Sequence, residues 1–167
     1  AGALLHVVNH GLFKSLLFFS AGAVVHATGT REIDHYGGLL RRQPWTAVCF
    51  LGGAVAICGL PPFNGFVSEW LIYLAAFGTI RGDGLTLRLA VLAAPALALI
   101  GGLALACFVK VFGVAFLGEP RTPAAAAVDH DAAPSMRGPM LLLLLACAWI
   151  GLLPGTGLPW IGVILAV

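Results

Sequence analysis

The chain has 167 residues, of which 60% are hydrophobic and only 10% charged, and its mean hydropathy is +0.99. Soluble domains do not reach such values, so the composition indicates a polytopic membrane protein. A net charge of +2, without any block of basic residues, gives no support to nucleic-acid binding. The four cysteines lie in apolar runs without metal-ligand spacing, which is typical of small core residues rather than of a metal site.

The apolar run of residues 4–27 is long enough to cross a bilayer, and it carries three titratable side chains. Crossing ~30 Å of hydrocarbon at a rise of 1.5 Å per residue takes about 20 residues. His6, His10 and Lys14 follow one another at intervals of four residues, which places them on one side of a helix. Lys14 lies about ten residues from either end of the run, further than a lysine reaches by snorkelling. A charge at that depth costs at least ~2.5–3.5 kcal/mol and requires a partner or a wet cavity.

This row of side chains has more than one interpretation. A single histidine would be read as a core residue bonded to a backbone carbonyl. The histidine pair could also bind a metal, but no third ligand lies near it, and bis-histidine haem needs facing histidines on separate helices. A hydrogen-bonded row of groups that titrate near neutrality is what proton relay requires. We therefore predict that His6, His10 and Lys14 form a proton relay.

A second apolar region, residues 45–80, is interrupted by two consecutive prolines. Pro61 and Pro62 have no amide hydrogen to donate, and Gly59 and Gly65 stand on either side of them, so the helix must break here. Each half is only about 15 residues or ~22 Å long, which is short for a separate span. One broken helix is therefore favoured over two short spans joined by an exposed turn.

Glu69 follows the break, in what the sequence predicts to be the first turn of the second half-helix. The positive end of that half-helix would stabilise a carboxylate without any transport role. Helix breaks at membrane depth, however, commonly mark ion pathways. A structural role and a role as the fourth member of the proton relay both stay open for Glu69.

The remaining chain predicts further spans and an all-α fold. Residues 89–117 are expected to form a third span and residues 139–153 a shorter fourth one, while residues 158–167 begin another. The fold class is therefore a polytopic transmembrane helix bundle with one proline-broken helix.

Three polar connections separate these spans, at residues 28–44, 81–88 and 118–138. The last connection is rich in alanine and proline, so we expect a flexible loop in which Asp129 and Asp131 are solvated rather than bound to a cation. With the broken helix counted as one span, the first and last connections share one side of the membrane. They carry more arginines than the second, which predicts that they are cytoplasmic.

Several motifs together resemble the antiporter-like membrane subunits of respiratory complex I, Mrp antiporters and membrane-bound hydrogenases. These motifs are residues 6–18 (HVVNHGLFKSLLF), 37–39 (GGL) and 60–69 (LPPFNGFVSE). Residues 28–31 (TGTR) and 64–70 (NGFVSEW) resemble the branch that contains the membrane subunits of hydrogenase-4 and formate hydrogenlyase. The resemblance covers about residues 4–118 and is weak beyond them.

The resemblance implies a fold of inverted five-helix repeats, in which a central lysine passes protons to an exit group. Residues 1–118 would be part of the second repeat of the proton-translocating domain, and residues 119–167 would be a loop and C-terminal transmembrane helices. The relay of the family maps onto His6, His10 and Lys14, and the position after the break, a lysine or a glutamate in the family, is Glu69. The first repeat is missing, so we expect a piece of a longer protein that does not transport by itself.

The expected function is that of a proton-translocating subunit of a membrane-bound hydrogenase or NADH:quinone oxidoreductase-like complex, in the cytoplasmic membrane of a prokaryote. Its partners would be other membrane and hydrophilic subunits, the lipid bilayer and protons, and we expect neither a cofactor nor a redox site on this chain. One alternative is a subunit of an Mrp-type cation/proton antiporter. Another is a structural membrane anchor whose buried charges only fix helix packing.

Overall fold

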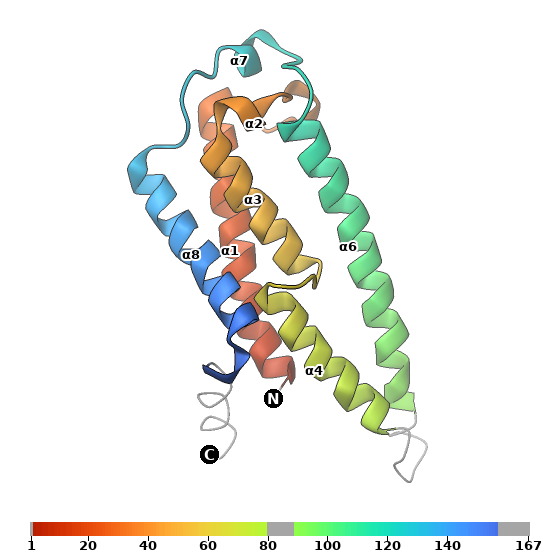
Figure 1. Ribbon diagram of the computed structural model, residues 1–167. Helices are drawn as coiled ribbons and strands as arrows, with labels where there is room; N and C mark the ends of the chain where they lie inside the picture. Colours follow the sequence, from red (N-terminus) through yellow and green to blue (C-terminus); the bar gives the residue numbers. More distant parts are fainter. Residues whose placement is uncertain (1, 80–88, 157–167) are drawn as a thin grey trace.

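The computed structural model describes residues 2–79 and 89–156, and all regular secondary structure in these ranges is helical. Long helices cross the molecule in alternating directions (Figure 1). They are α1 (Gly2–Thr28), α3 (Pro44–Ile57) continued by α4 (Asn64–Gly78), α6 (Ala93–Phe116) and α8 (Pro134–Leu152). Short helices lie between them: η1 (Ile33–His35), α2 (Leu39–Arg42), η3 (Ala90–Leu92) and α7 (Pro123–Ala126). The predicted all-α membrane bundle is thus confirmed, while the expected turn at 81–88 and the apolar segment 158–167 lie outside the described residues.

Three helices are long and apolar enough to cross a membrane: α1, α6 together with η3, and α8. Helix α1 is unbroken, as predicted for residues 4–27. Its end follows from local chemistry, because the Thr28 hydroxyl donates to the Val24 carbonyl at 2.8 Å and Gly29 adopts φ +72°. A glycine in the left-handed region directly after the last turn is a common helix stop.

Helices α3 and α4 form the broken helix that the proline pair predicts. The amide of Gly59 donates to the Ala56 carbonyl and the amide of Leu60 to the Val55 carbonyl, both at 3.2 Å, and Gly59 has φ +64°. This hydrogen-bond pattern is a Schellman motif, which closes the C-terminus of α3 and requires a residue that tolerates positive φ. Beyond it, α4 continues in the same direction as α3 (Figure 1), so the two halves make one crossing.

The boundaries of the break differ from the prediction at its C-terminal side. Helix α4 already begins at Asn64, so Gly65 lies in its first turn rather than in the break. Glu69 consequently falls in the second turn of α4, not in the first as the sequence predicts. Because the helix dipole acts mainly within the first turn, it gives Glu69 less support than expected.

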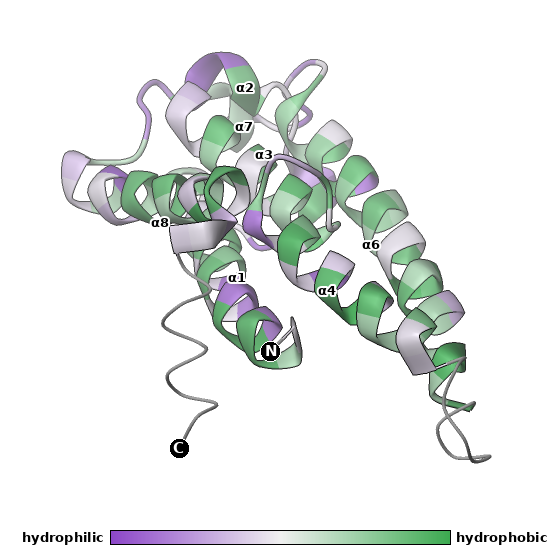
Figure 2. Cartoon of the chain, turned by 60° about the horizontal axis from the view of Figure 1, so that its bottom comes forward, coloured by the Kyte–Doolittle hydropathy of each residue, from purple (hydrophilic) through white to green (hydrophobic). Residues whose placement is uncertain are grey.

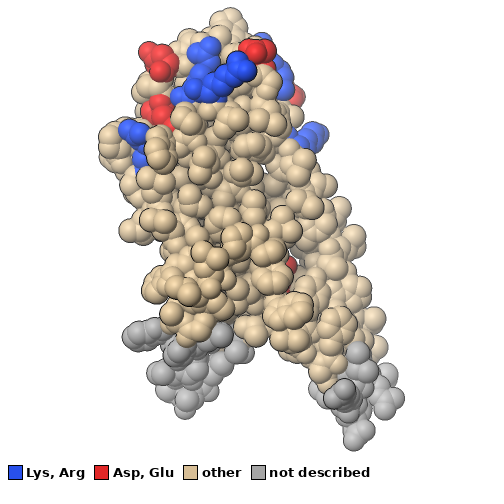
Figure 3. Space-filling model, viewed as in Figure 1, with Lys and Arg blue, Asp and Glu red and all other residues tan. Residues whose placement is uncertain are grey.

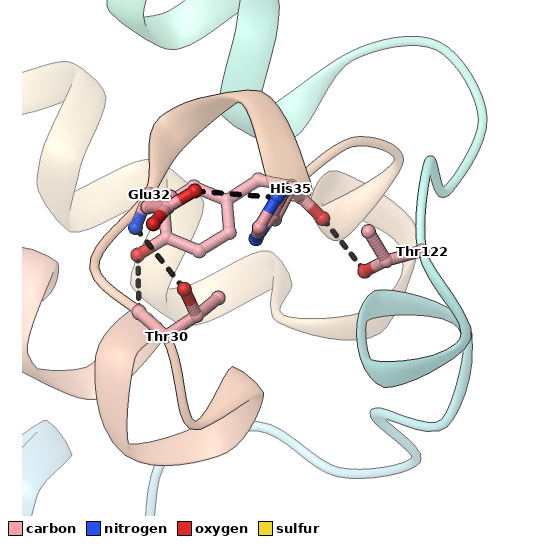
Figure 4. Close-up of polar contacts among 5 residues, drawn as sticks. Thr30, Glu32, His35 and Thr122 are labelled. Atoms are coloured by element: carbon pink, nitrogen blue, oxygen red, sulfur yellow. Dashed lines mark hydrogen bonds and ion pairs between the residues drawn. The ribbon is translucent and has the colours of Figure 1, made fainter.

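Helix α8 begins five residues earlier than predicted from the apolar run. Pro134 occupies the first turn and Pro139 lies inside the helix, where it removes one backbone hydrogen bond. The connection before α8, which the composition predicts to be a flexible loop, is bonded to the connection between α1 and α3. Arg42 donates to the Val128 carbonyl at 2.7 Å, and the Thr122 hydroxyl donates to the His35 carbonyl at 2.8 Å (Figure 4).

The prediction that the Asp131 carboxylate is solvated is wrong. Its two oxygens accept from the Trp45 amide and from the Thr46 hydroxyl, each at 2.6 Å. These donors lie in the first turn of α3, whose N-cap residue Gln43 makes no side-chain cap. Asp131 therefore caps α3 from a loop more than 80 residues away in sequence, and its charge suits the positive end of that helix.

Helix α1 lies at the centre of the bundle and packs against α3, α4 and α8. Its buried side contributes Leu17 to a cluster with Phe50 and Phe116, and Leu16 to a second cluster with Met140. Helix α6, in contrast, exposes most of its apolar surface, and Figure 2 shows hydrophobic colour along its length. Charged side chains gather at the end of the molecule that carries the loops (Figure 3). This distribution is that of a membrane-embedded bundle with one polar end.

Candidate functional site

The titratable row predicted for α1 lies along the edge of the buried side of that helix. His6 and Lys14 are half-buried, and His10 is exposed. The centroids of the two imidazole rings are 6.2 Å apart, and the ring of buried Phe13 stands edge-on to His10 at 5.3 Å. The two histidines are therefore neighbours but do not bond directly to each other.

Lys14 is stabilised by an aromatic ring rather than by a carboxylate. Its Nζ lies 5.5 Å from the ring centroid of Phe18, which is within the range of a cation–π interaction. The ion pairs among residues 2–79 and 89–156 all lie in the polar end of the molecule and do not include Lys14. The structure thus places the Lys14 amine near the middle of the apolar helix α1, with no ion-pair partner in the described part of the chain.

A polar seam joins α1 to the first turns of α4, directly beyond the break. We define it as His6, Asn9, Asn64 and Ser68. Asn9 Nδ2 donates to the Asn64 carbonyl at 2.8 Å, and His6 Nδ1 lies 3.0 Å from the Ser68 hydroxyl. That hydroxyl also donates to the Gly65 carbonyl at 3.0 Å. The seam connects the titratable row on one helix to the interrupted backbone of another.

Sequence reasoning missed three members of this seam. Asn9, Asn64 and Ser68 have no exposed surface, although they are polar residues in apolar segments. Asn9 Oδ1 and both amide atoms of Asn64 make no hydrogen bond within the described residues. Buried amides are ordinarily bonded to protein or to water, so the seam has polar groups suited to holding water. The sequence does carry a signal for them. Asn9 is a polar residue on the buried side of α1, and Asn64 and Ser68 are two polar residues four positions apart in α4.

Glu69 lies on another side of α4, facing α6. Because successive helical residues diverge by about 100°, Ser68 points to α1 while Glu69 lines a cavity of about 430 Å³. Its neighbours around this cavity include Tyr73 and, on α6, Gly101. Figure 3 shows acidic atoms inside the hollow beside α6. The structure therefore brings His6 close to the turn that carries Glu69, but it does not bring the carboxylate into contact with the histidine row.

The break itself is enclosed by close backbone packing on one side. A side chain at Gly65 would overlap the Ala56 carbonyl, and one at Gly151 of α8 would overlap the Pro62 carbonyl. Pro61 and Pro62 are exposed on the other side. Interrupted backbone at membrane depth is tolerated where protein or a water-filled cavity surrounds it, and α1 and α8 supply protein contacts here.

Comparison with known proteins gives the same family as these residues. Residues 1–110 match the family model described as NADH:quinone oxidoreductase/Mrp antiporter, TM. The chain is 43% identical over 152 residues to "Hydrogenase-4 component B" of Escherichia coli (strain K12), covering 90% of this chain and 22% of that protein. It is 40% identical over 161 residues to "Formate hydrogenlyase subunit 3" of the same strain, covering 96% of this chain and 26% of that protein.

Antiporter proteins are also among the similar ones. A Na(+)/H(+) antiporter subunit of Alkalihalophilus pseudofirmus (strain ATCC BAA-2126 / JCM 17055 / OF4) is 38% identical over 121 residues, covering 72% of this chain and 23% of that protein. In "Structure of Mrp complex from Dietzia sp. DQ12-45-1b", one chain superimposes with a TM-score of 0.78 at 22% identity, covering 94% of this chain and 35% of that chain. This structural likeness supports the fold alone.

The chain spans about a quarter of the length of the two hydrogenase-related proteins, 22% and 26%. The family model covers more than half of the chain, from residue 1 to residue 110. The helices that span the matched region are those of an apolar bundle with one broken helix. The chain thus belongs to the NADH:quinone oxidoreductase/Mrp antiporter transmembrane family and is a multi-pass membrane protein.

Proposed function

We propose that this chain is part of a proton-translocating membrane subunit of a membrane-bound hydrogenase or NADH:quinone oxidoreductase-like complex in a prokaryotic cytoplasmic membrane. The names of its two E. coli relatives support the hydrogenase branch. In this proposal residues 1–118 belong to the second repeat of the translocating domain, and residues 119–167 form a loop and C-terminal transmembrane helices. The partners are the other membrane and hydrophilic subunits of the complex.

The observation that carries the proposal is the 3.0 Å contact between His6 Nδ1 and the Ser68 hydroxyl. This contact connects a row of titratable groups to an interrupted helix. Both features cost free energy in a membrane, and residues of this kind commonly belong to ion or proton pathways. A proton on Lys14 would pass along His10 and His6, and the 6.2 Å between the two ring centroids requires bridging water. Glu69 would bind or release the proton on the other side of α4.

Electron transfer belongs to partner subunits in this proposal. The chain would respond to it through changes in protonation and charge at His6, His10, Lys14 and Glu69. None of these side chains has to change its oxidation state. A proton leaves one base and binds the next, so the sum of protons is conserved at each step.

The test is proton uptake by vesicles that carry the full complex with Lys14→Arg or Lys14→Ala. Arginine keeps the positive charge but scarcely deprotonates, so both variants should lose most uptake while the complex still assembles. A charge that only fixes helix packing would tolerate arginine better than alanine. Wild-type uptake in an assembled Lys14→Arg complex would leave Lys14 with a packing role and favour the structural anchor.

Cation/proton antiport is the second candidate function. The 38% identity to a Na(+)/H(+) antiporter subunit favours it. Proton flux through the full complex should be independent of sodium if the hydrogenase assignment is correct. Flux that requires a sodium gradient and runs opposite to it would assign the chain to the antiporters.

A further inference from the structure

We propose that Gly59 is a positioning residue for Glu69: the missing side chain at the end of α3 leaves the space in which the Glu69 carboxylate rests against the helix break. The proposal rests on the proposed function in one respect, which is that the position of the Glu69 carboxylate matters for proton transfer. The contact between Gly59 and Glu69 does not itself depend on transport. It adds a second requirement to the one already described for Gly59, which is its positive φ in the Schellman motif.

The contact is specific to these two residues. A Cβ built on Gly59 would overlap Oε2 of Glu69 and would lie 2.7 Å from its Cδ and 3.0 Å from its Oε1. All three nearest atoms thus belong to one carboxylate. Among the described glycines, no other would place a Cβ against a carboxylate group.

The carboxylate is the part that would move. It is the end of a flexible side chain, whereas Gly59 is held by its own amide bond to the Ala56 carbonyl and by the bond of the next amide, that of Leu60, to the Val55 carbonyl. The cavity of about 430 Å³ that Glu69 already lines offers the room to accept it. A methyl group at position 59 should therefore push the carboxylate away from the break and toward α6, with the helices left in place.

The chain offers controls that separate this contact from backbone strain. Gly29 has φ +72° and Gly118 has φ +74°, close to the +64° of Gly59, but a Cβ at either control position meets nothing within 4 Å. Alanine suffers similar left-handed strain at all three positions. Only at Gly59 does it also displace Glu69.

The first experiment measures the reactivity of Glu69 in the full complex. Dicyclohexylcarbodiimide reacts with protonated carboxyl groups in apolar surroundings, and mass spectrometry of the labelled peptide gives the rate at Glu69. We expect Gly59→Ala to raise the labelling rate several-fold, because the carboxylate moves into the cavity, and Gly29→Ala and Gly118→Ala to leave it unchanged. An unchanged rate in Gly59→Ala, or an equal change in all three variants, would overturn the proposal.

A second measurement covers the case in which Gly59→Ala assembles poorly. Asparagine adopts the left-handed region more readily than alanine does, so Gly59→Asn carries a Cβ with less strain and should show the same rise in labelling. In addition, the loss of thermal stability caused by Gly59→Ala should shrink in a Glu69→Ala background to that of Gly118→Ala. Additive losses would mean that the two residues do not interact.

Failure of the Gly59 proposal can be distinguished from failure of the proposed function. If Glu69→Gln leaves proton uptake intact, Glu69 carries no proton, yet labelling and the double-mutant cycle still decide whether Gly59 positions it. If Glu69→Gln abolishes uptake while Gly59→Ala leaves the labelling rate unchanged, the function stands and the positioning role of Gly59 is wrong.

Discussion

At the scale of single residues, Glu69 has an unusual position for a carboxylate. It is half-buried in the second turn of a half-helix at membrane depth, and the ion pairs of the described residues do not include it. A carboxylate in such surroundings is costly, and most such residues in membrane proteins are functional. Its use as a proton acceptor would explain why the cost is tolerated.

We therefore predict that Glu69→Gln keeps the complex assembled and removes most of its proton uptake. Glutamine has nearly the same shape but cannot bind and release a proton in the neutral range. Glu69→Lys should retain more uptake, because a lysine amine in a half-buried site can also bind and release a proton. Uptake in vesicles, normalised to the amount of assembled complex, measures the effect, and full uptake by Glu69→Gln would remove this residue from the relay.

Asn9 has a different role, because its amide supports the backbone of the break. It is fully buried and donates to the Asn64 carbonyl at 2.8 Å. Asn9→Ala should lower the free energy of unfolding by about 1–3 kcal/mol, since it removes this bond and leaves a buried acceptor less satisfied. Gly22→Ala is the control on the same helix, where an added Cβ meets nothing within 4 Å. Equal thermal stability of Asn9→Ala and Gly22→Ala complexes would contradict this role.

At the scale of elements, α3 depends on a cap that it does not carry itself. Asp131 accepts from the Trp45 amide and from the Thr46 hydroxyl. Asp131→Ala should therefore destabilise the assembled protein by about 1 kcal/mol, the usual cost of losing an N-cap. The effect should appear as a lower midpoint of thermal unfolding.

Asp129 provides the control for this prediction. Its carboxylate bonds to His130 at 2.6 Å on the surface, and this hydrogen bond is the main reason why the pKa of Asp129 is below its usual value. Asp129→Ala touches no helix terminus, so it should leave the midpoint unchanged. Equal effects of Asp129→Ala and Asp131→Ala would mean that loop charge, rather than capping, stabilises α3.

The connection between α1 and α3 is also held by contacts within itself. The Tyr36 hydroxyl donates to the Thr30 carbonyl at 2.7 Å, and His35 pairs with Glu32 (Figure 4). The phenol keeps its proton in the neutral range, as an ordinary tyrosine does, and burial raises the pKa of Tyr36 further. Together with the bonds of Arg42 to Val128 and of Thr122 to His35, these contacts join the two connections at the polar end of the molecule.

At the scale of the whole molecule, the alternating directions of the crossings place residues 29–43 and 117–133 at the same end. The amide of Gly38 donates to the Leu117 carbonyl at 3.0 Å, which joins the two connections directly. From their excess of arginine we predict that this end faces the cytoplasm.

The sidedness is testable by labelling with a membrane-impermeant maleimide. In a variant without the four native cysteines, Arg31→Cys and Asp129→Cys should both react in inside-out vesicles and not in intact cells. Both positions are exposed in the chain, so burial within the chain does not shield them from the reagent. Reaction of both in intact cells would reverse the orientation, and reaction from opposite sides would contradict the fold.

Local chemistry was sufficient to predict the long helices and the break, but not the residues at which α4 and α8 begin. The length of the apolar runs determines where α1 and α6 cross, because the hydrocarbon thickness sets the number of residues needed. Pro61 and Pro62 determine the break, since neither can donate to a helix. The period of 3.6 residues places His6, His10 and Lys14 on one side of α1. Each of these conclusions depends on neighbours in sequence.

Only the tertiary structure decided what the elements do to one another. Asn9 meets Asn64, Asp131 caps α3, and Gly59 makes room for Glu69, although the capping pair is more than 80 residues apart and the first pair 55. Such contacts depend on the distance and angle at which helices pack. The apolar pattern of one helix does not determine these, because an apolar surface can face lipid as well as another helix. The sequence alone therefore determined a membrane bundle with a titratable row and a broken helix, and packing determined how the row and the break are joined.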